Sequence, residues 1–155
     1  MKQLDLRGLL AVLYEHGVSF VAIGGVAVAA HGYVRATEDL DIVPEFEPAN
    51  LARLGAALGE IDATLPTAGG RPFDPSGDTR ELRQRRNLTL ETTLGGLDVV
   101  QRGPGVPSFR TLDDHAVETE LLGVPVRICS LPHLREMKRA RATAQDVADL
   151  EGVPE

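Results

Sequence analysis

The chain has 155 residues, of which 43% are hydrophobic and 25% are charged, and its formal net charge is −7 at pH 7. These values are typical of a folded globular protein and exclude a disordered chain. The negative charge argues against indiscriminate binding of nucleic acid, because an acidic surface repels a polyanion. The one cysteine, Cys129, excludes an intrachain disulfide and a zinc site made of cysteines, and its strand-like surroundings predict a buried thiol.

Hydrophobic periodicity and turn residues predict helices and strands in alternation along the chain. Helices are expected at residues 4–16, 26–31, 49–58, 130–141 and 144–150. Strands are expected at 19–23 and 40–43, and in two hairpins, 88–92 with 97–101 and 117–122 with 124–129. Gly95-Gly96 and Gly123 are predicted to turn these hairpins. Residues 63–78 are rich in Gly, Pro, Thr and Asp, which predicts a long functional or mobile loop. With no repeat or linker, we expect a single domain over residues 1–155.

Residues 17–34 contain no Asp, Glu, Lys or Arg and approach the length of a membrane span. The glycine pair inside this stretch, Gly24-Gly25, favours a strand, a turn and a helix instead. Asp5 and Arg7 lie where a signal peptide would be apolar. We therefore expect a cytoplasmic protein without a membrane partner.

Two basic segments, residues 80–86 and 135–141, interrupt the acidic background. Each is either a solvated helix face or positive charge reserved for a particular anion. The four arginines of the first segment could contact an RNA substrate, although a solvated, mobile segment is the favoured interpretation.

Two aspartates, Asp39 and Asp41, lie at the start of the predicted strand 40–43. Alternate strand residues share a face, so their carboxylates point the same way. Two carboxylates about 4 Å apart repel by roughly 4 kcal/mol at an effective dielectric constant near 20. Protonation, salt bridges or a bound cation can relieve this repulsion. A divalent ion is the preferred solution, because Mg²⁺ binds one or two carboxylates together with phosphate oxygens and water.

A third aspartate, Asp98, lies among apolar residues in the predicted strand 97–101. If that strand lies beside residues 40–43, Asp98 reaches the pair. Three carboxylates around one or two metal ions are what two-metal phosphoryl chemistry requires. The alternative is a solvent-facing strand position.

The glycine pair Gly24-Gly25 comes where strand 19–23 turns into a helix. Such a turn leaves backbone N–H groups free to bind phosphate, although a simple tight turn is the commoner case. The pair precedes the two aspartates by about fifteen residues, so the short helix between them could set both on one side of a cleft.

A resemblance to a known family rests on Gly24-Gly25, Ala27, His31-Gly32, Arg35, Thr37 and Asp39-Leu40-Asp41-Ile42. These residues resemble the signature of the minimal nucleotidyltransferases of the DNA polymerase β superfamily, and among them the toxin enzymes of the AbiEii and MenT kind. The runs 131–138 and 146–150 resemble the late helices of these toxins. The resemblance implies an α/β (α+β) fold, in which a mixed β-sheet is flanked by helices.

The resemblance also assigns roles to individual residues. Gly24-Gly25 would hold the triphosphate, and Asp39 and Asp41 would hold Mg²⁺, with Mn²⁺ as the alternative ion. Asp98 would assist the second metal and the attacking hydroxyl. Lys138 would face the nucleotide phosphates, and Asp146 matches a later aspartate of the family.

One departure concerns the glycine motif, which is Gly-Ser in much of the superfamily and lacks the serine hydroxyl here. Phosphate binding at this turn then depends on backbone N–H groups and on Arg35 or Lys138. Arg35 could equally neutralise a carboxylate, and Lys138 could be exposed to solvent. For His31 a bond to a local carbonyl is favoured, and for Thr37 a role in orienting the strand of the aspartates.

The sequence therefore predicts an Mg²⁺-dependent enzyme that moves a nucleoside monophosphate from an NTP to an acceptor hydroxyl and releases pyrophosphate. The resemblance implies tRNA or another RNA as the acceptor, ahead of a protein or a small molecule, and a cognate antitoxin as a partner. One alternative is a non-catalytic nucleotide-binding or antitoxin-like protein of the same fold. Another is a small-molecule (antibiotic) nucleotidyltransferase, with an acceptor pocket built by the loop 63–78.

Overall fold

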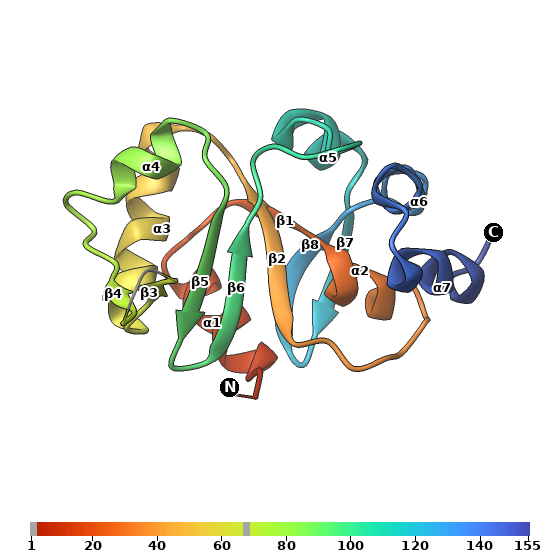
Figure 1. The fold of residues 1–155 in the computed structure, drawn as a ribbon, viewed down its shortest axis with the longest axis horizontal. Helices are drawn as coiled ribbons and strands as arrows, with labels where there is room; N and C mark the ends of the chain where they lie inside the picture. Colours follow the sequence, from red (N-terminus) through yellow and green to blue (C-terminus); the bar gives the residue numbers. More distant parts are fainter. Residues whose placement is uncertain (1–2, 67–68) are drawn as a thin grey trace.

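The computed structural model describes residues 3–66 and 69–155 and contains an eight-stranded mixed β-sheet flanked by helices (Figure 1). The strand order is β4-β3-β5-β6-β2-β1-β8-β7. The strands are β1 (Phe20–Ile23), β2 (Asp39–Pro44), β3 (Thr64–Leu65), β4 (Arg71–Pro72), β5 (Leu88–Thr92), β6 (Gly95–Val99), β7 (Val117–Leu121) and β8 (Val124–Ile128). The helices are α1 (Leu6–Glu15), α2 (Gly24–Ala30), α3 (Pro48–Glu60), α4 (Thr79–Arg83), α5 (Phe109–His115), α6 (Leu131–Arg141) and α7 (Ala144–Gly152).

The centre of the sheet explains why the fold can build a site. β2 runs antiparallel to β1 and parallel to β6, while β1 runs parallel to β8. Along β2 the side chains alternate, so Leu40 and Ile42 are fully buried on one face while Asp39 and Asp41 lie on the other. Helices α6 and α7 contact each other at one end of the sheet, with α2 beside α6 (Figure 1).

The core is formed largely by leucines at helical spacing. Leu9, Leu10 and Leu13 on α1 are almost completely buried, as are Leu51, Leu54 and Leu58 on α3. This pattern is the one-sided apolar stripe from which the two helices were predicted. Helix α1 begins two residues later than predicted because Asp5 accepts a hydrogen bond from the Gly8 amide and caps the helix. None of the described helices is long and apolar enough to cross a membrane.

The turn of the first hairpin differs from the prediction. It is made by Thr93 and Leu94, and Gly95-Gly96 opens β6 instead of turning the chain. The hydroxyl of Thr92 closes this turn, because it donates to the Gly95 carbonyl at 2.8 Å and accepts from the Leu94 amide at 3.0 Å. The second hairpin turns at Leu122-Gly123 as predicted, with both residues at positive φ.

Most described residues of segment 63–78 are turn or irregular, as predicted, and only Thr64–Leu65 and Arg71–Pro72 form strands that were not expected. Residues 67–68 lie outside the described residues. The two strands, β3 and β4, pair with each other, and β3 extends the sheet from β5. Arg71 and Asp78 then fasten the segment through a two-pronged ion pair of 2.8 and 2.9 Å. Helix α5, capped by the Ser108 hydroxyl, was missed because its seven residues are too few for a clear period.

Candidate functional site

The three predicted acids come together because β2 and β6 are parallel neighbours. Asp41 lies opposite Asp98 in the ladder, and Asp39 lies opposite Gly96. Residues paired in this way point to the same face of a sheet. The predicted adjacency of Asp98 to the pair is therefore confirmed.

Two glycines make room for the aspartate side chains. A Cβ atom on Gly96 would overlap Oδ1 of Asp39, and one on Gly24 would overlap Oδ2 of Asp41. Gly24 also has φ +66°, a conformation that other residues rarely adopt. From the sequence, Gly24 was expected to bind phosphate or to form a tight turn, and Gly96 was expected to form a turn. The missed signal is that a glycine inside a strand often marks the close approach of another group.

The pKa values of Asp39 and Asp41 are both raised, so their surroundings disfavour the ionised forms. Burial raises the pKa of Asp41 to about 7, and the neighbouring Asp98 and Asp39 carboxylates add to this shift, while Arg141 opposes it. Burial also raises the pKa of Asp39, together with the charges of Asp98 and Glu91. A cation placed among these side chains would remove the repulsion and restore the ionised forms.

One oxygen of the cluster supports a cation directly. Oδ1 of Asp98 is buried and has no hydrogen-bond partner among the described residues. An unpaired buried carboxylate oxygen is costly, and a metal ion is a common way to satisfy it. Among the described residues, no group of three or more His, Cys, Asp or Glu side chains is arranged so that the group by itself could hold a metal ion. The fit to Mg²⁺ therefore rests on this oxygen, on the hard oxygen donors and on the space that the two glycines leave.

A second acidic cluster lies beside the first, on α7, and its charges are fully matched. Asp149 accepts from Nε and Nη2 of Arg35 at 2.7 and 2.9 Å. The Lys138 ammonium lies 3.1 Å from Asp146 and 2.9 Å from Asp149. Arg141 binds the two oxygens of Asp146 at 2.8 Å each. Both aspartates are completely buried.

These contacts decide two questions left open by the sequence. Lys138 is only 4% exposed, so the solvent-exposed alternative for this side chain is wrong. Arg35 does neutralise a carboxylate, but it is Asp149 and not the pair on β2. Both cations line the cavity beside the three acids, and their contact with phosphate stays a prediction.

The pKa values of the second cluster move in the opposite direction. Burial raises the pKa of Asp146, but hydrogen bonds from Arg141, Thr143 and Lys138 outweigh burial and lower it well below its usual range. For Asp149 the bonds from Arg35 and Lys138 likewise outweigh burial. Asp146 also forms a capping box with Thr143 at the start of α7. This cluster therefore has a structural role, because it joins α6, α7 and Arg35 through buried ion pairs.

Two cavities meet at Asp41, Lys138 and Arg141. The first, of about 410 Å³, is polar and is lined by the three acids together with Gly25, Arg35 and Thr37, among others. The second, of about 260 Å³, is floored mainly by apolar residues, among them Val100, Val106, Leu134 and Met137. No described residue of segment 63–78 lines either cavity. The idea that this segment builds the acceptor pocket is therefore wrong, because β3 and β4 extend the far edge of the sheet.

Three residues at the smaller cavity were not singled out from the sequence. Asn87 bonds the loop after β6 through its side chain, with 2.7 Å to the Gln101 amide and 2.9 Å to the Arg102 amide. This places Asn87 and Arg102 at the cavity wall. Arg141 lines both cavities. The basic run 135–141 was a signal for Arg141 only, and charge alone does not say which residue of a run faces a site.

The remaining candidates have structural partners. His31 Nε2 lies 2.8 Å from a carbonyl, but this is the distant Cys129 carbonyl and not the local one expected. The Thr37 hydroxyl donates to the Asp39 carbonyl at 3.2 Å. Burial raises the pKa of the Cys129 thiol to about 12, as expected for a structural cysteine. The four arginines of the first basic segment are exposed, although Leu82 between them is buried. Arg85 stacks on Phe46 with 4.1 Å to the ring centroid.

The sequence matches no family model and no curated protein. The fold is similar to the crystal structure of a proposed nucleotidyltransferase from Thermotoga maritima. The similarity covers 94% of this chain and 86% of the other, with a TM-score of 0.55 and 14% identity. At this identity the comparison establishes the fold: a mixed sheet flanked by helices, as the sequence predicted.

Proposed function

We propose that the protein is a metal-dependent nucleotidyltransferase that uses Asp39, Asp41 and Asp98. The observation that carries the proposal is the register that sets Asp98 beside Asp41, with one Asp98 oxygen buried and unpartnered. A protein that only needed a stable core would gain by replacing these acids, because among the described cations only the charge of Arg141 opposes the raised pKa of Asp41. The similar fold of the Thermotoga protein supports the general class.

In this proposal Asp39 and Asp41 hold Mg²⁺, or Mn²⁺ as the alternative. When bound, the ion supplies the positive charge that the nucleotide phosphates and the leaving pyrophosphate require. The polar cavity of about 410 Å³ takes the triphosphate, near the backbone of Gly25. Arg141 is the exposed cation at this point, while Arg35 and Lys138 set the positive wall behind it.

The reaction is the attack of an acceptor hydroxyl on the α-phosphate, with pyrophosphate as the leaving group. Asp98 would assist the metal site through its unpartnered oxygen and would help the attacking hydroxyl lose its proton, because it lies opposite Asp41 on the same face of the sheet. Most of the catalysis comes from alignment of the two reactants and from charge neutralisation. The smaller, apolar-floored cavity takes a nucleoside, of either the NTP or the acceptor.

The acceptor is proposed from the resemblance to toxins of the AbiEii and MenT kind: tRNA or another RNA, within a single nucleotidyltransferase domain that a cognate antitoxin would restrain. The exposed arginines 80, 83, 85 and 86 are available for such a polyanion. A small-molecule acceptor is the second candidate, and the limited volume of the smaller cavity favours it.

The direct test is incubation of the protein with each α-labelled NTP, Mg²⁺ and total RNA or a panel of small hydroxyl acceptors. We expect label in one acceptor class and release of pyrophosphate. Transfer that survives both Asp41→Asn and Asp98→Asn contradicts the mechanism. Nucleotide binding by calorimetry without any pyrophosphate release favours the non-catalytic alternative.

A further inference from the structure

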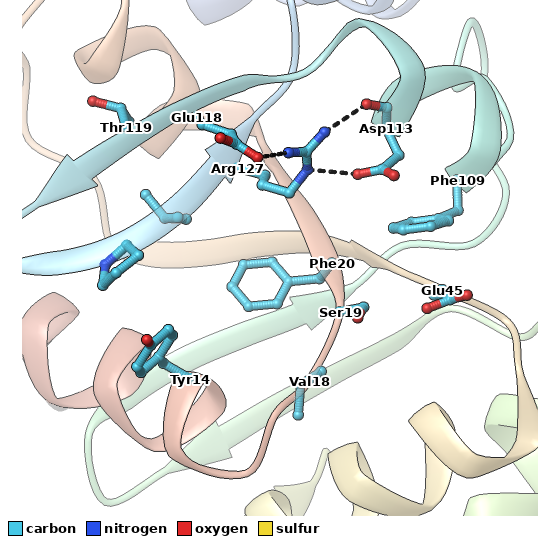
Figure 2. Close-up of a pocket in the computed structure, with 12 residues that line it drawn as sticks. Tyr14, Val18, Ser19, Phe20, Glu45, Phe109, Asp113, Glu118, Thr119 and Arg127 are labelled. Carbon is cyan, nitrogen blue, oxygen red and sulfur yellow. Dashed lines mark hydrogen bonds and ion pairs between the residues drawn. The ribbon is translucent and has the colours of Figure 1, made fainter.

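A third cavity, of about 630 Å³, lies at the other end of β1 from the three acids (Figure 2). Phe20 begins β1 and lines this cavity, whereas Ile23 ends the strand opposite Asp41. The cavity is enclosed by α1, by α5 and by the hairpin β7–β8. Its volume is within the range of pockets that bind small molecules, about 300–1,000 Å³. None of its lining residues belongs to the proposed transferase site.

The walls of this cavity are aromatic and aliphatic. Phe20 and Phe109 approach it from β1 and from the first turn of α5, and Tyr14 reaches it from α1 (Figure 2). Tyr14 is 59% exposed, although it is one of only two tyrosines in a chain without tryptophan. Aromatic faces carry negative potential and attract cations.

The polar groups of the cavity carry a net negative charge. Arg127 is committed to neighbours: its Nε donates to Asp113 Oδ1 at 2.6 Å, its Nη2 to the Asp113 carbonyl at 2.8 Å, and its Nη1 to Glu118 (Figure 2). Two carboxylates therefore face one guanidinium. Glu45 adds a third carboxylate, for which no described side chain is a hydrogen-bond or ion-pair partner. The lining therefore repels anions, so the ligand of this cavity differs in charge from the nucleotides proposed for the transferase site.

We infer that this cavity binds a small organic cation with an apolar body, such as an aryl-alkyl ammonium. The ammonium would lie against the Glu45 carboxylate and the aromatic faces, and the body would pack on Phe20 and Phe109. The half-buried position of Glu45 strengthens such an ion pair relative to one at the open surface. The inference does not depend on the transferase proposal, because it uses other residues.

The test uses the whole protein and two probes of matched size, phenethylammonium and 3-phenylpropionate, titrated by calorimetry and by NMR of the amide signals. We expect the cation to bind, with shifts at Tyr14, Phe20 and Glu45, and the anion to bind at least about tenfold more weakly. Glu45→Gln should weaken binding of the cation by about tenfold, since it removes the free charge and keeps the shape. The control Asp41→Asn should bind the cation as the wild type does.

Three results overturn the inference: equal binding of the two probes, unchanged binding in Glu45→Gln, or shifts confined to residues outside the cavity. The Glu45 side chain makes no described bond, so Glu45→Gln should fold, and its circular dichroism spectrum checks this. Phe109→Leu is a second variant that preserves the charge. Phe109→Leu should weaken binding of the cation less than Glu45→Gln does, but by more than the experimental error of the wild-type affinity.

Discussion

The two acidic clusters at one end of the sheet have the same chemical groups and opposite electrostatics. Asp39, Asp41 and Asp98 face each other with little positive charge, and the pKa values of Asp39 and Asp41 are raised. Asp146 and Asp149 are more deeply buried, yet their pKa values are lowered. The two clusters differ because the nearby cationic side chains all form ion pairs with the second cluster. These side chains are Arg35, Lys138 and Arg141. The first cluster is left for a cation from outside.

The largest expected effect tests the first cluster. Asp41→Asn or Asp98→Asn should each reduce nucleotidyl transfer by about a thousandfold or more, because each removes a negative charge that positions the ion or accepts the proton. The assay is pyrophosphate release under single-turnover conditions. The matched control is Glu15→Gln, an exposed carboxylate on α1 that lines neither cavity of the proposed site, which should retain activity within a few-fold. If Glu15→Gln and Asp41→Asn lose the same activity, the assignment of roles is wrong.

Substitutions in the second cluster should lower the stability of the fold. Lys138→Met leaves two buried aspartates with fewer partners, so we expect a loss of about 3 kcal/mol in the free energy of unfolding. Urea denaturation measures it. Arg139→Met, on the exposed side of the same helix, should change stability by less than about 0.5 kcal/mol. A loss of activity in Lys138→Met without loss of stability would instead make this lysine a phosphate ligand.

Substitution of Gly96, which fits closely against Asp39, should have a smaller effect on stability and activity than the changes above. Gly96→Ala forces the Asp39 carboxylate aside, which should cost about 1–3 kcal/mol in stability and reduce metal-dependent activity. Gly77→Ala is the control, because a Cβ there meets its neighbours at ordinary distance. Thermal unfolding and the pyrophosphate assay distinguish the two variants. A fully active Gly96→Ala would show that the space is not needed for the ion.

The smallest effect is the pH dependence of the metal-free protein. The folded-state pKa of Asp41 is about 7 and its ordinary value is 3.8. A raised carboxyl pKa contributes stability that is present below pH 4 and lost as pH rises through 7. Asp41→Asn should therefore be more stable than the wild type at pH 8 and equal to it near pH 4. The pKa values of Asp146 and Asp149 are lowered, so these residues stabilise the folded state at neutral pH, and this stabilisation is lost as pH falls. A wild type as stable as Asp41→Asn at pH 8 would contradict the raised pKa.

Much of this arrangement was predictable from the sequence, for identifiable reasons. The parallel pairing of β2 and β6 that joins Asp98 to Asp41 follows once the two apolar strands are placed beside each other. The pairing of Arg35 with Asp149 was not predictable, because 114 residues separate the two and only the packed fold joins them. The turn before β6 was misplaced because Gly95-Gly96 has the composition of a turn, while its actual use is to admit Asp39. Local pattern therefore predicted the elements and the acids, whereas the assignment of cations to acids required tertiary structure.

The central claim is that the first cluster binds a divalent ion and the second does not need one. Titration of the protein with Mn²⁺ in the presence of a non-hydrolysable NTP analogue, followed by electron paramagnetic resonance, tests it most directly. We predict saturable binding in the wild type and in Glu15→Gln, and binding weakened by at least about tenfold in Asp41→Asn. Equal Mn²⁺ affinity in Asp41→Asn and the wild type, or no binding in the wild type, would contradict the claim.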